Sequence, residues 1–293
     1  MKDPVFTGSS TAIVTPFLNG NVDYTSLAGI IDMQMIAGTA ALTVCGTTGE
    51  SSSMGDYERT DVLRFCRKRC PSAKLIAGAG SNSTSHALEL SLAAQDAGAD
   101  ALLLVTPYYN KATQAGLIKH YEYIADRVSI PIILYNVPSR TGVSFTAETY
   151  GVLSRHPMIN AVKEASGDMN LTKSAMALCG DELNIYTGND ENTVPMMALG
   201  AKGVISVAAN IIPDVMRCMT QLCLQSRFDE ASSLQIRYND LIRALFLEVN
   251  PIPVKTAMSM MGICSDEMRL PMCAMGEINR ARLAEIMQKH GMI

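Results

Sequence analysis

The sequence has no tryptophan and few charged side chains. The balance of charge limits the classes of molecule that the protein is expected to bind. Charged residues are 18% of the 293 residues, and 24 basic against 28 acidic residues give a formal net charge of −4. A chain with this balance has no basic excess for binding nucleic acid or an anionic membrane. It also lacks an uninterrupted apolar run of about 18 residues, the length that spans a bilayer. We therefore expect neither nucleic acid nor a membrane as a partner.

Motifs for metals, disulfides and common cofactors are also missing. The eight cysteines form no Cys-x-x-Cys pair, and none of the four histidines lies four residues from another. No P-loop, EF-hand, zincin or Gly-x-Ser-x-Gly motif occurs. The chain begins without the basic and apolar stretches of a secretory signal, so we expect a cytoplasmic protein with free thiols. The sequence predicts no metal site and no cofactor.

Short apolar runs recur along the first two-thirds of the chain, with amphipathic helical stretches between them. Residues 101–105 are apolar throughout, as expected for a parallel strand that is covered on both faces. Eight strands that alternate with helices indicate an α/β fold, the (β/α)₈ or TIM barrel. The runs lie at 11–17, 41–46, 75–79, 101–106, 132–137, 159–162, 183–187 and 203–208.

Helix caps support this pattern, although one loop suggests another architecture. Asp23 is placed to cap a helix that stops at Gly38, and Ser83 to cap one that stops near Gly98. The segment 78–83 resembles the dinucleotide loop of a doubly wound open sheet. It lacks the third glycine and an acidic partner for a ribose, so the barrel is favoured.

The strand signal ends near residue 225. Helical patterns follow at 229–249, 253–261 and 278–289, which is more than the one helix needed to finish a barrel. We expect residues 1–225 to form the barrel with the active site. Residues 226–293 are expected to form a C-terminal helical layer that packs on the barrel and does not fold independently.

The predicted sixth strand carries a lysine, Lys163, before its apolar run has finished. Active sites of such barrels lie at the carboxyl ends of the strands. A desolvated lysine there can attack a carbonyl group and form a Schiff base. In the alternative interpretation, Lys163 only marks the strand end, with its ammonium group in water or paired with Glu164.

Three other predicted strands are also followed by polar residues, on the same rim of the barrel. Tyr135 is suited to proton transfer and Arg140 to binding a carboxylate, unless they are a core tyrosine and a solvated loop arginine. The turn at 46–51 offers amides and threonine hydroxyls for a small carboxylate, or is only a glycine turn with a helix cap. Tyr108 and Tyr109 suggest an interface or a lid over the site, or an ordinary aromatic anchor.

These segments together resemble the dihydrodipicolinate synthase family, within the superfamily of class I Schiff-base aldolases that includes N-acetylneuraminate lyase. The resemblance covers the chain essentially end to end. It implies a condensation of pyruvate with aspartate semialdehyde to 4-hydroxy-tetrahydrodipicolinate, on the route to diaminopimelate and lysine, without a cofactor. The motifs are GTTGES at 46–51, TPYYN at 106–110, YNVPSRTG at 135–142, VKEASGD at 162–168, TGND at 187–190, GVISV at 203–207 and NPIPVK at 250–255.

The resemblance also implies roles for single residues. Lys163 would form the imine with pyruvate, and Tyr135 would shuttle protons. Thr47 would link Tyr135 to Tyr109, which a neighbouring subunit lends in this family, in a tight dimer commonly paired into a homotetramer. Thr48 would bind the pyruvate carboxylate together with Thr47.

Three further residues complete the implied site. Arg140 would bind the carboxylate of the semialdehyde. Gly188 and the backbone carbonyl of Ile205 would form the pocket wall around the lysine. Arg140 also distinguishes the implied function from its nearest rival. The sialic acid lyases and related 2-keto-acid aldolases typically lack this arginine. A non-catalytic barrel that binds pyruvate-like ligands is a third hypothesis, although a pure binding protein would not need a proton relay.

One departure from the family concerns a cleft where some members bind lysine as an inhibitor. Those members carry a histidine aligned with Asp56 and a glutamate aligned with His86. Ser51, Asn82 and Tyr108 of the same cleft are retained. Because a potential cation replaces the glutamate, we expect lysine inhibition to be weak or absent.

Overall fold

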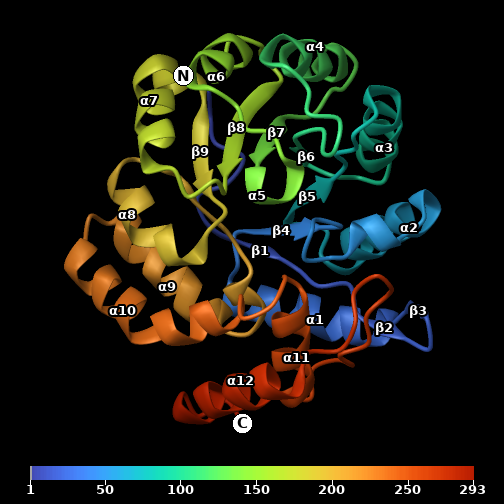
Figure 1. Cartoon of the computed structure of the whole chain (residues 1–293), viewed down its shortest axis with the longest axis vertical. Coiled ribbons are helices and arrows are strands. Elements are labelled where there is room, and N and C mark those ends of the chain that lie inside the picture. The colour runs from blue at the N-terminus through green and yellow to red at the C-terminus, as the bar shows by residue number, and fades with distance from the viewer. Residues whose placement is uncertain (1) are drawn as a thin grey trace.

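Eight parallel strands close into a barrel in the computed structural model, which describes residues 2–293 (Figure 1). Strand β1 pairs with both β4 and β10, so the sheet has no open edge. The closed barrel confirms the predicted fold and rules out the open doubly wound sheet. The strands are β1 (Gly8–Ala12), β4 (Ala41–Val44), β5 (Lys74–Gly78), β6 (Ala101–Val105), β7 (Ile132–Asn136), β8 (Ile159–Glu164), β9 (Asn184–Thr187) and β10 (Gly203–Ser206).

The first strand lies earlier than the sequence predicted. It covers Gly8–Ala12, so only residues 11 and 12 of the predicted run 11–17 lie in the strand. The rest of that run leads into a small hairpin of β2 (Phe17–Leu18) and β3 (Asn21–Val22). The strand is rich in buried hydroxyl side chains, and two of the three find side-chain partners, whereas Ser9 Oγ has none within residues 2–293. Ser10 Oγ lies 2.9 Å from Thr43 Oγ1, and Thr11 Oγ1 donates to Gln34 Oε1 at 2.6 Å. An apolar pattern could not reveal a strand of this kind.

Helices return the chain between the strands. The Asp23 carboxylate accepts from two backbone amides at the start of α1, and Gly38 ends it in the left-handed region at φ 71°. Helix α3 follows Ser83, whose side chain makes no capping bond. The helices are α1 (Tyr24–Ala37), α2 (Asp56–Arg69), α3 (Thr84–Asp96), α4 (Gln114–Ala125), α5 (Pro138–Thr141), α6 (Ala147–Leu153), α7 (Met169–Cys179), α8 (Thr193–Ala198) and α9 (Pro213–Leu224), with 3₁₀ turns at Ser51–Ser53, Gly180–Glu182, Asp190–Asn192 and Ala208–Asn210.

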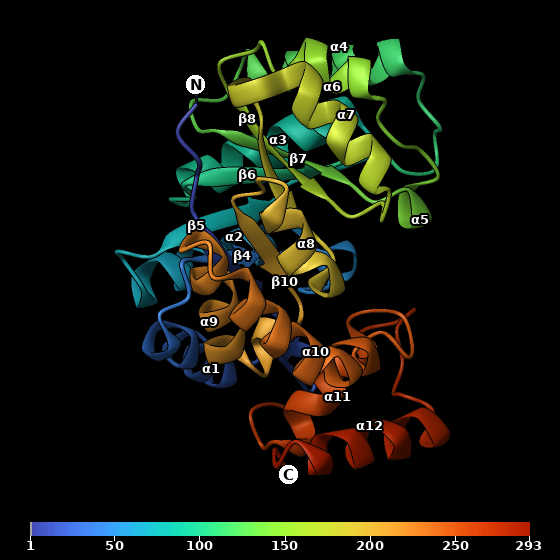
Figure 2. The ribbon, with the colours of Figure 1, turned by 90° about the vertical axis from the view of Figure 1, so that its left-hand side faces the viewer.

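Three more helices lie together beyond the barrel, as Figure 2 shows. They are α10 (Phe228–Ala244), α11 (Ile252–Met260) and α12 (Glu277–Lys289), and α10 packs against α8 and α9. The first ends at Ala244, five residues before the predicted end at 249. The division of the chain at residues 225 and 226 stays a prediction. No helix among residues 2–293 is long and apolar enough to cross a bilayer.

A buried ion pair joins this helical layer to the barrel. Lys255 Nζ of α11 lies 2.7 Å from Glu50 Oε1, and the side chains are 0% and 2% exposed. Lys255 also donates to the Glu267 carbonyl at 2.6 Å, and Glu50 Oε2 accepts from the Arg269 amide at 3.2 Å. Burial lowers the pKa of Lys255 below its usual value. Loss of one partner of such a pair leaves a buried charge and costs about 3–5 kcal/mol, so the loop at 46–53 is firmly held against α11.

Candidate active site

A cavity of about 190 Å³ opens at the carboxyl ends of the barrel strands. Its walls include side chains from several loops and from the helical layer, which contributes Phe246 and Asn250. The cavity brings together most of the residues that the sequence predicted for the active site, although not Tyr109 or Ile205. Those that line the cavity are Thr47, Thr48, Tyr135, Arg140, Lys163 and Gly188.

The lysine predicted to react lies in the barrel mouth and not in solvent. Lys163 is 6% exposed, and its Nζ lies 4.6 Å from the centre of the Tyr135 ring. Tyr135 on β7 and Lys163 on β8 are paired in register, which fixes this neighbourhood. Within residues 2–293 the amine has neither a hydrogen-bond nor an ion-pair partner. The enclosed amine therefore faces a cavity in which a small carbonyl compound can meet it.

Glu164 does not neutralise this lysine. Its carboxylate accepts from Asn136 Nδ2 at 3.0 Å, from Tyr150 Oη at 2.8 Å and from the Ser166 amide at 2.7 Å. Successive side chains of a strand point to opposite faces, so Glu164 is turned away from the barrel interior. The alternative in which the two residues pair is wrong.

Gly188 provides the space that the lysine needs. A Cβ atom at this position would lie 2.8 Å from Lys163 Cε and 2.7 Å from Ala165 Cβ. Contacts this short would force the lysine side chain to move. The predicted pocket wall at Gly188 is thus a place where backbone must approach the lysine closely. Ile205 is buried in β10, and its backbone carbonyl stays a predicted part of the wall; Val207, two residues later, lines the cavity.

Asn250 joins the two predicted carboxylate-binding groups, a role that the sequence analysis missed. Its Nδ2 donates to Thr48 Oγ1 at 3.0 Å, and its backbone carbonyl accepts from Arg140 Nη2 at 3.0 Å. The residue is 6% exposed and lies just before α11. Its motif, 250–255, was visible in the sequence. Its place in the site depends on how the helical layer docks, which no local pattern encodes.

The predicted proton relay is not assembled within one chain. Tyr109 is 87% exposed on the loop after β6, and its backbone has a φ of 72° that tyrosine rarely adopts. Within residues 2–293, the hydroxyl groups of Thr47, Tyr109 and Tyr135 make no hydrogen bond. The relay through Tyr109 stays a prediction.

The residues of the predicted lysine cleft fall into separate environments. His86 Nε2 lies 3.0 Å from Asp56 Oδ2, and His86 Nδ1 lies 3.1 Å from Ser81 Oγ. The Asn82 carbonyl accepts from Asn110 Nδ2 at 2.7 Å. The other two residues of the predicted cleft, Ser51 and Tyr108, line a second cavity of about 230 Å³ beside the active site.

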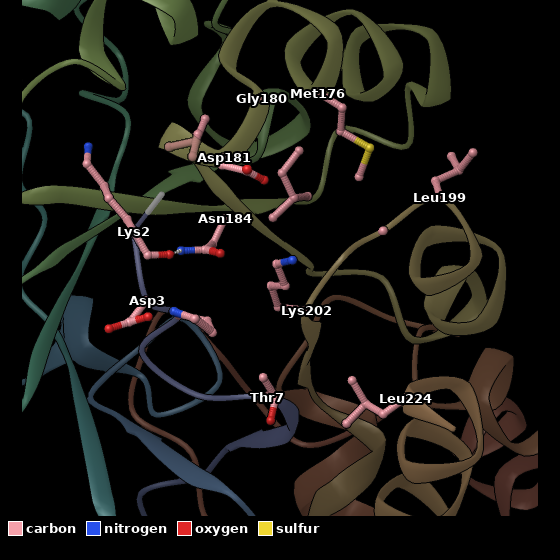
Figure 3. Close-up of a pocket in the computed structure, with 14 residues that line it drawn as sticks. Lys2, Asp3, Thr7, Met176, Gly180, Asp181, Asn184, Leu199, Lys202 and Leu224 are labelled. Carbon is pink, nitrogen blue, oxygen red and sulfur yellow. Dashed lines mark hydrogen bonds between the residues drawn. The ribbon is translucent and has the colours of Figure 1, made fainter. Parts of the chain in front are cut away.

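A larger cavity of about 550 Å³ lies at the opposite end of the barrel, around the N-terminal segment (Figure 3). Asn184 Nδ2 donates to the Lys2 carbonyl at 3.1 Å, and the Lys2 ammonium donates to the carbonyls of Ser154, His156 and Ile159. These polar groups hold the N-terminal segment in place. Because this cavity has no counterpart of the Lys163 and Tyr135 pair, we assign the chemistry to the smaller cavity.

Comparison with known proteins agrees with this geometry. Residues 5–290 match the model of the "Dihydrodipicolinate synthetase family". The 4-hydroxy-tetrahydrodipicolinate synthase of Geobacter sulfurreducens is 50% identical, over 99% of this chain and 100% of that protein.

Solved structures are also similar to this chain over almost its whole length. The dihydrodipicolinate synthase from Aquifex aeolicus is 42% identical with a TM-score of 0.96, over 98% of this chain and 99% of that one. The chloride-inhibited enzyme from Acinetobacter baumannii complexed with pyruvate is 41% identical with a TM-score of 0.96, over the same shares. The similarity of sequence and structure along the whole barrel shows that this chain belongs to the dihydrodipicolinate synthetase family.

Proposed function

We propose that this protein is a lyase that condenses pyruvate with L-aspartate 4-semialdehyde to 4-hydroxy-tetrahydrodipicolinate, in the synthesis of diaminopimelate and lysine. The family assignment supports this reaction. The observation that carries it is the buried amine of Lys163, which lies 4.6 Å from the Tyr135 ring in a cavity at the barrel mouth.

The first half-reaction activates pyruvate. The neutral amine of Lys163 attacks the ketone carbon, and water leaves to give an imine. The protonated imine withdraws electrons from the neighbouring methyl group, so that loss of a methyl proton gives an enamine. Tyr135 is the proposed proton carrier, because it neighbours Lys163 in the sheet register.

The second half-reaction forms the new carbon–carbon bond. The enamine carbon attacks the aldehyde of the semialdehyde, whose carboxylate is held by Arg140 at the rim. The amino group of this second substrate then attacks the imine carbon, which closes the ring and releases Lys163. Positioning both substrates in one cavity removes much of the entropic cost of bringing them together.

Asn250 sets the direction of the Thr48 hydroxyl. Since Thr48 Oγ1 accepts a hydrogen bond from Asn250 Nδ2, its own hydrogen is left for another acceptor. A pyruvate carboxylate in the cavity is such an acceptor. The backbone carbonyl of the same asparagine accepts a hydrogen bond from Arg140, so one residue positions both carboxylate-binding groups.

A homotetramer and a cytoplasmic location also belong to the proposal. The exposed Tyr109 side chain supports a neighbouring subunit as its binding partner, where it would complete the relay with Thr47 and Tyr135. One structural relative, with a TM-score of 0.97 and 36% identity over 99% of this chain and 98% of that one, is described as a monomeric variant. The barrel fold by itself therefore does not fix the number of subunits.

The reaction is tested by comparing two substrate pairs. We expect turnover with pyruvate plus aspartate semialdehyde, and none above background with pyruvate plus N-acetylmannosamine. Arg140 at the cavity rim suits the carboxylate of the first pair and not a hydroxylated sugar. The reverse preference would establish the rival aldolase, N-acetylneuraminate lyase or a relative. Inactivity with both pairs would favour the non-catalytic barrel.

Covalent trapping tests the nucleophile. Borohydride added with pyruvate should reduce the imine to a stable adduct on Lys163, and peptide mass mapping should locate it. Lys255 provides an internal control, because it is a buried lysine paired with Glu50. An adduct on another lysine, or no adduct, would contradict the mechanism.

Arg140→Ala tests the subsite of the second substrate. We expect kcat/KM for the semialdehyde to fall about tenfold or more, as for the loss of a charged hydrogen bond worth 1.5–3 kcal/mol. Trapping of the pyruvate imine should continue. Equal damage to both steps would show that the arginine has only a structural role.

Asn250→Asp tests the direction of the Thr48 hydroxyl. The carboxylate keeps the size of the side chain but accepts the Thr48 hydrogen, so KM for pyruvate should rise about tenfold, equivalent to 1.4 kcal/mol. In a Thr48→Val background the same substitution should have little further effect on this KM. Additive losses in the double variant would mean that Asn250 does not act through Thr48.

A further inference from the structure

The catalytic cavity contains positive charge without an acid to balance it. Lys163 and Arg140 both line it, whereas no aspartate or glutamate among residues 2–293 does. Tyr135 is the other titratable side chain in its wall. Glu164, the neighbour of Lys163 on β8, is bound on the other face of the sheet. A carboxylate of the protein that balances a cation on Lys163 therefore has to act from behind the cavity wall.

Asp190 lies behind this wall and joins two of its segments. It comes two residues after Gly188, which lines the cavity at the end of β9. Its Oδ2 accepts hydrogen bonds from the backbone amides of Val207 and Ala208, both at 3.0 Å, in the turn after β10. Because Val207 lines the same cavity, the carboxylate links two wall segments that enclose Lys163.

The Asp190 carboxylate is buried and has no cation bound to it. The residue is 1% exposed, and it takes part in no ion pair within residues 2–293. Its second oxygen, Oδ1, is buried and accepts no hydrogen bond in this part of the chain. Buried polar atoms without a partner are rare in folded proteins because they are costly. Stability alone therefore does not account for an aspartate at this position.

Electrostatic interaction connects Asp190 with Lys163. Burial raises the pKa of Asp190, and the positive charge of Lys163 is among the influences that oppose this rise. The two amide donors on Oδ2 also favour the ionised carboxylate. The interaction between two charges is reciprocal, so an ionised Asp190 equally favours a positive charge on the Lys163 nitrogen.

We propose that Asp190 is a positioning residue whose buried negative charge stabilises a positive charge on the nitrogen of Lys163 from behind the cavity wall. In the proposed reaction, this positive charge is that of the protonated imine, which draws electrons from the methyl group of pyruvate. The same carboxylate holds the segments at Gly188 and Val207 together beside the lysine. Only the role in the imine rests on the proposed function, whereas the coupling of the two charges does not.

Asp190→Asn tests the coupling, because asparagine removes the charge but keeps the size and an oxygen for the two amides. Acetylation of Lys163 by acetic anhydride is measured as a function of pH in the full-length protein without pyruvate, and peptide mass mapping locates the product. An amine reacts only when it is unprotonated, so loss of the carboxylate should move the midpoint to lower pH, by about one unit. With pyruvate present, reduction of the protonated imine by cyanoborohydride should likewise decline at a lower pH than in the wild type.

Two control variants separate charge from structure. Glu191→Gln removes the same charge from the next residue, which is half exposed and lies 3.8 Å from Arg243. Gln235→Met removes the hydrogen bond from Gln235 Nε2 to the Asp190 carbonyl, at 3.1 Å, and loosens the same loop without changing its charge. Both controls should keep the midpoint of the wild type, although Gln235→Met should lower the free energy of unfolding.

Equal midpoints in the wild type and in Asp190→Asn would overturn the proposal, and so would a shift of the same size in either control. Asp190→Ser guards against a folding defect, since its hydroxyl can accept from an amide but carries no charge. If neither variant folded, the role of Asp190 would be structural and the proposal would fail. If borohydride and pyruvate leave no adduct on Lys163, the proposed function fails, whereas the acetylation midpoint still tests the coupling of the charges.

Discussion

Closure of the barrel between β1 and β10 is the constraint from which the site follows. At this seam the two backbones approach so closely that a Cβ on Gly203 would lie 1.9 Å from the Gly8 carbonyl oxygen. A closed parallel sheet sends every carboxyl end to one rim, which places side chains from distant parts of the chain around one opening. The pairing of Tyr135 with Lys163 is one result of this geometry.

Most of the barrel could be predicted because its strands are covered on both faces. Residues 101–105 are apolar without interruption, and the structure has a strand there. The first strand was misplaced because Ser10 and Thr11 enter the core by hydrogen bonding, which apolarity does not measure. Strand signals thus fail where polar side chains are satisfied inside the protein.

Site residues could be predicted where they lie at the ends of strands, and not where another part of the chain brings them to the site. Lys163 and Tyr135 were identifiable from their places at the ends of apolar runs. Asn250 was not, since it reaches the site through docking of the helical layer. Its importance lies in the residues that surround it, and the identity of a neighbour in space is the information that one sequence lacks.

The helical layer gives the chain an order of assembly. Asn250 completes the barrel mouth, yet it follows all eight barrel strands in the chain. Because the chain is synthesised from its N-terminus, Lys163 and Tyr135 leave the ribosome well before Asn250 does. The nascent barrel therefore carries Lys163, the proposed nucleophile, before the asparagine that donates to Thr48 has been made.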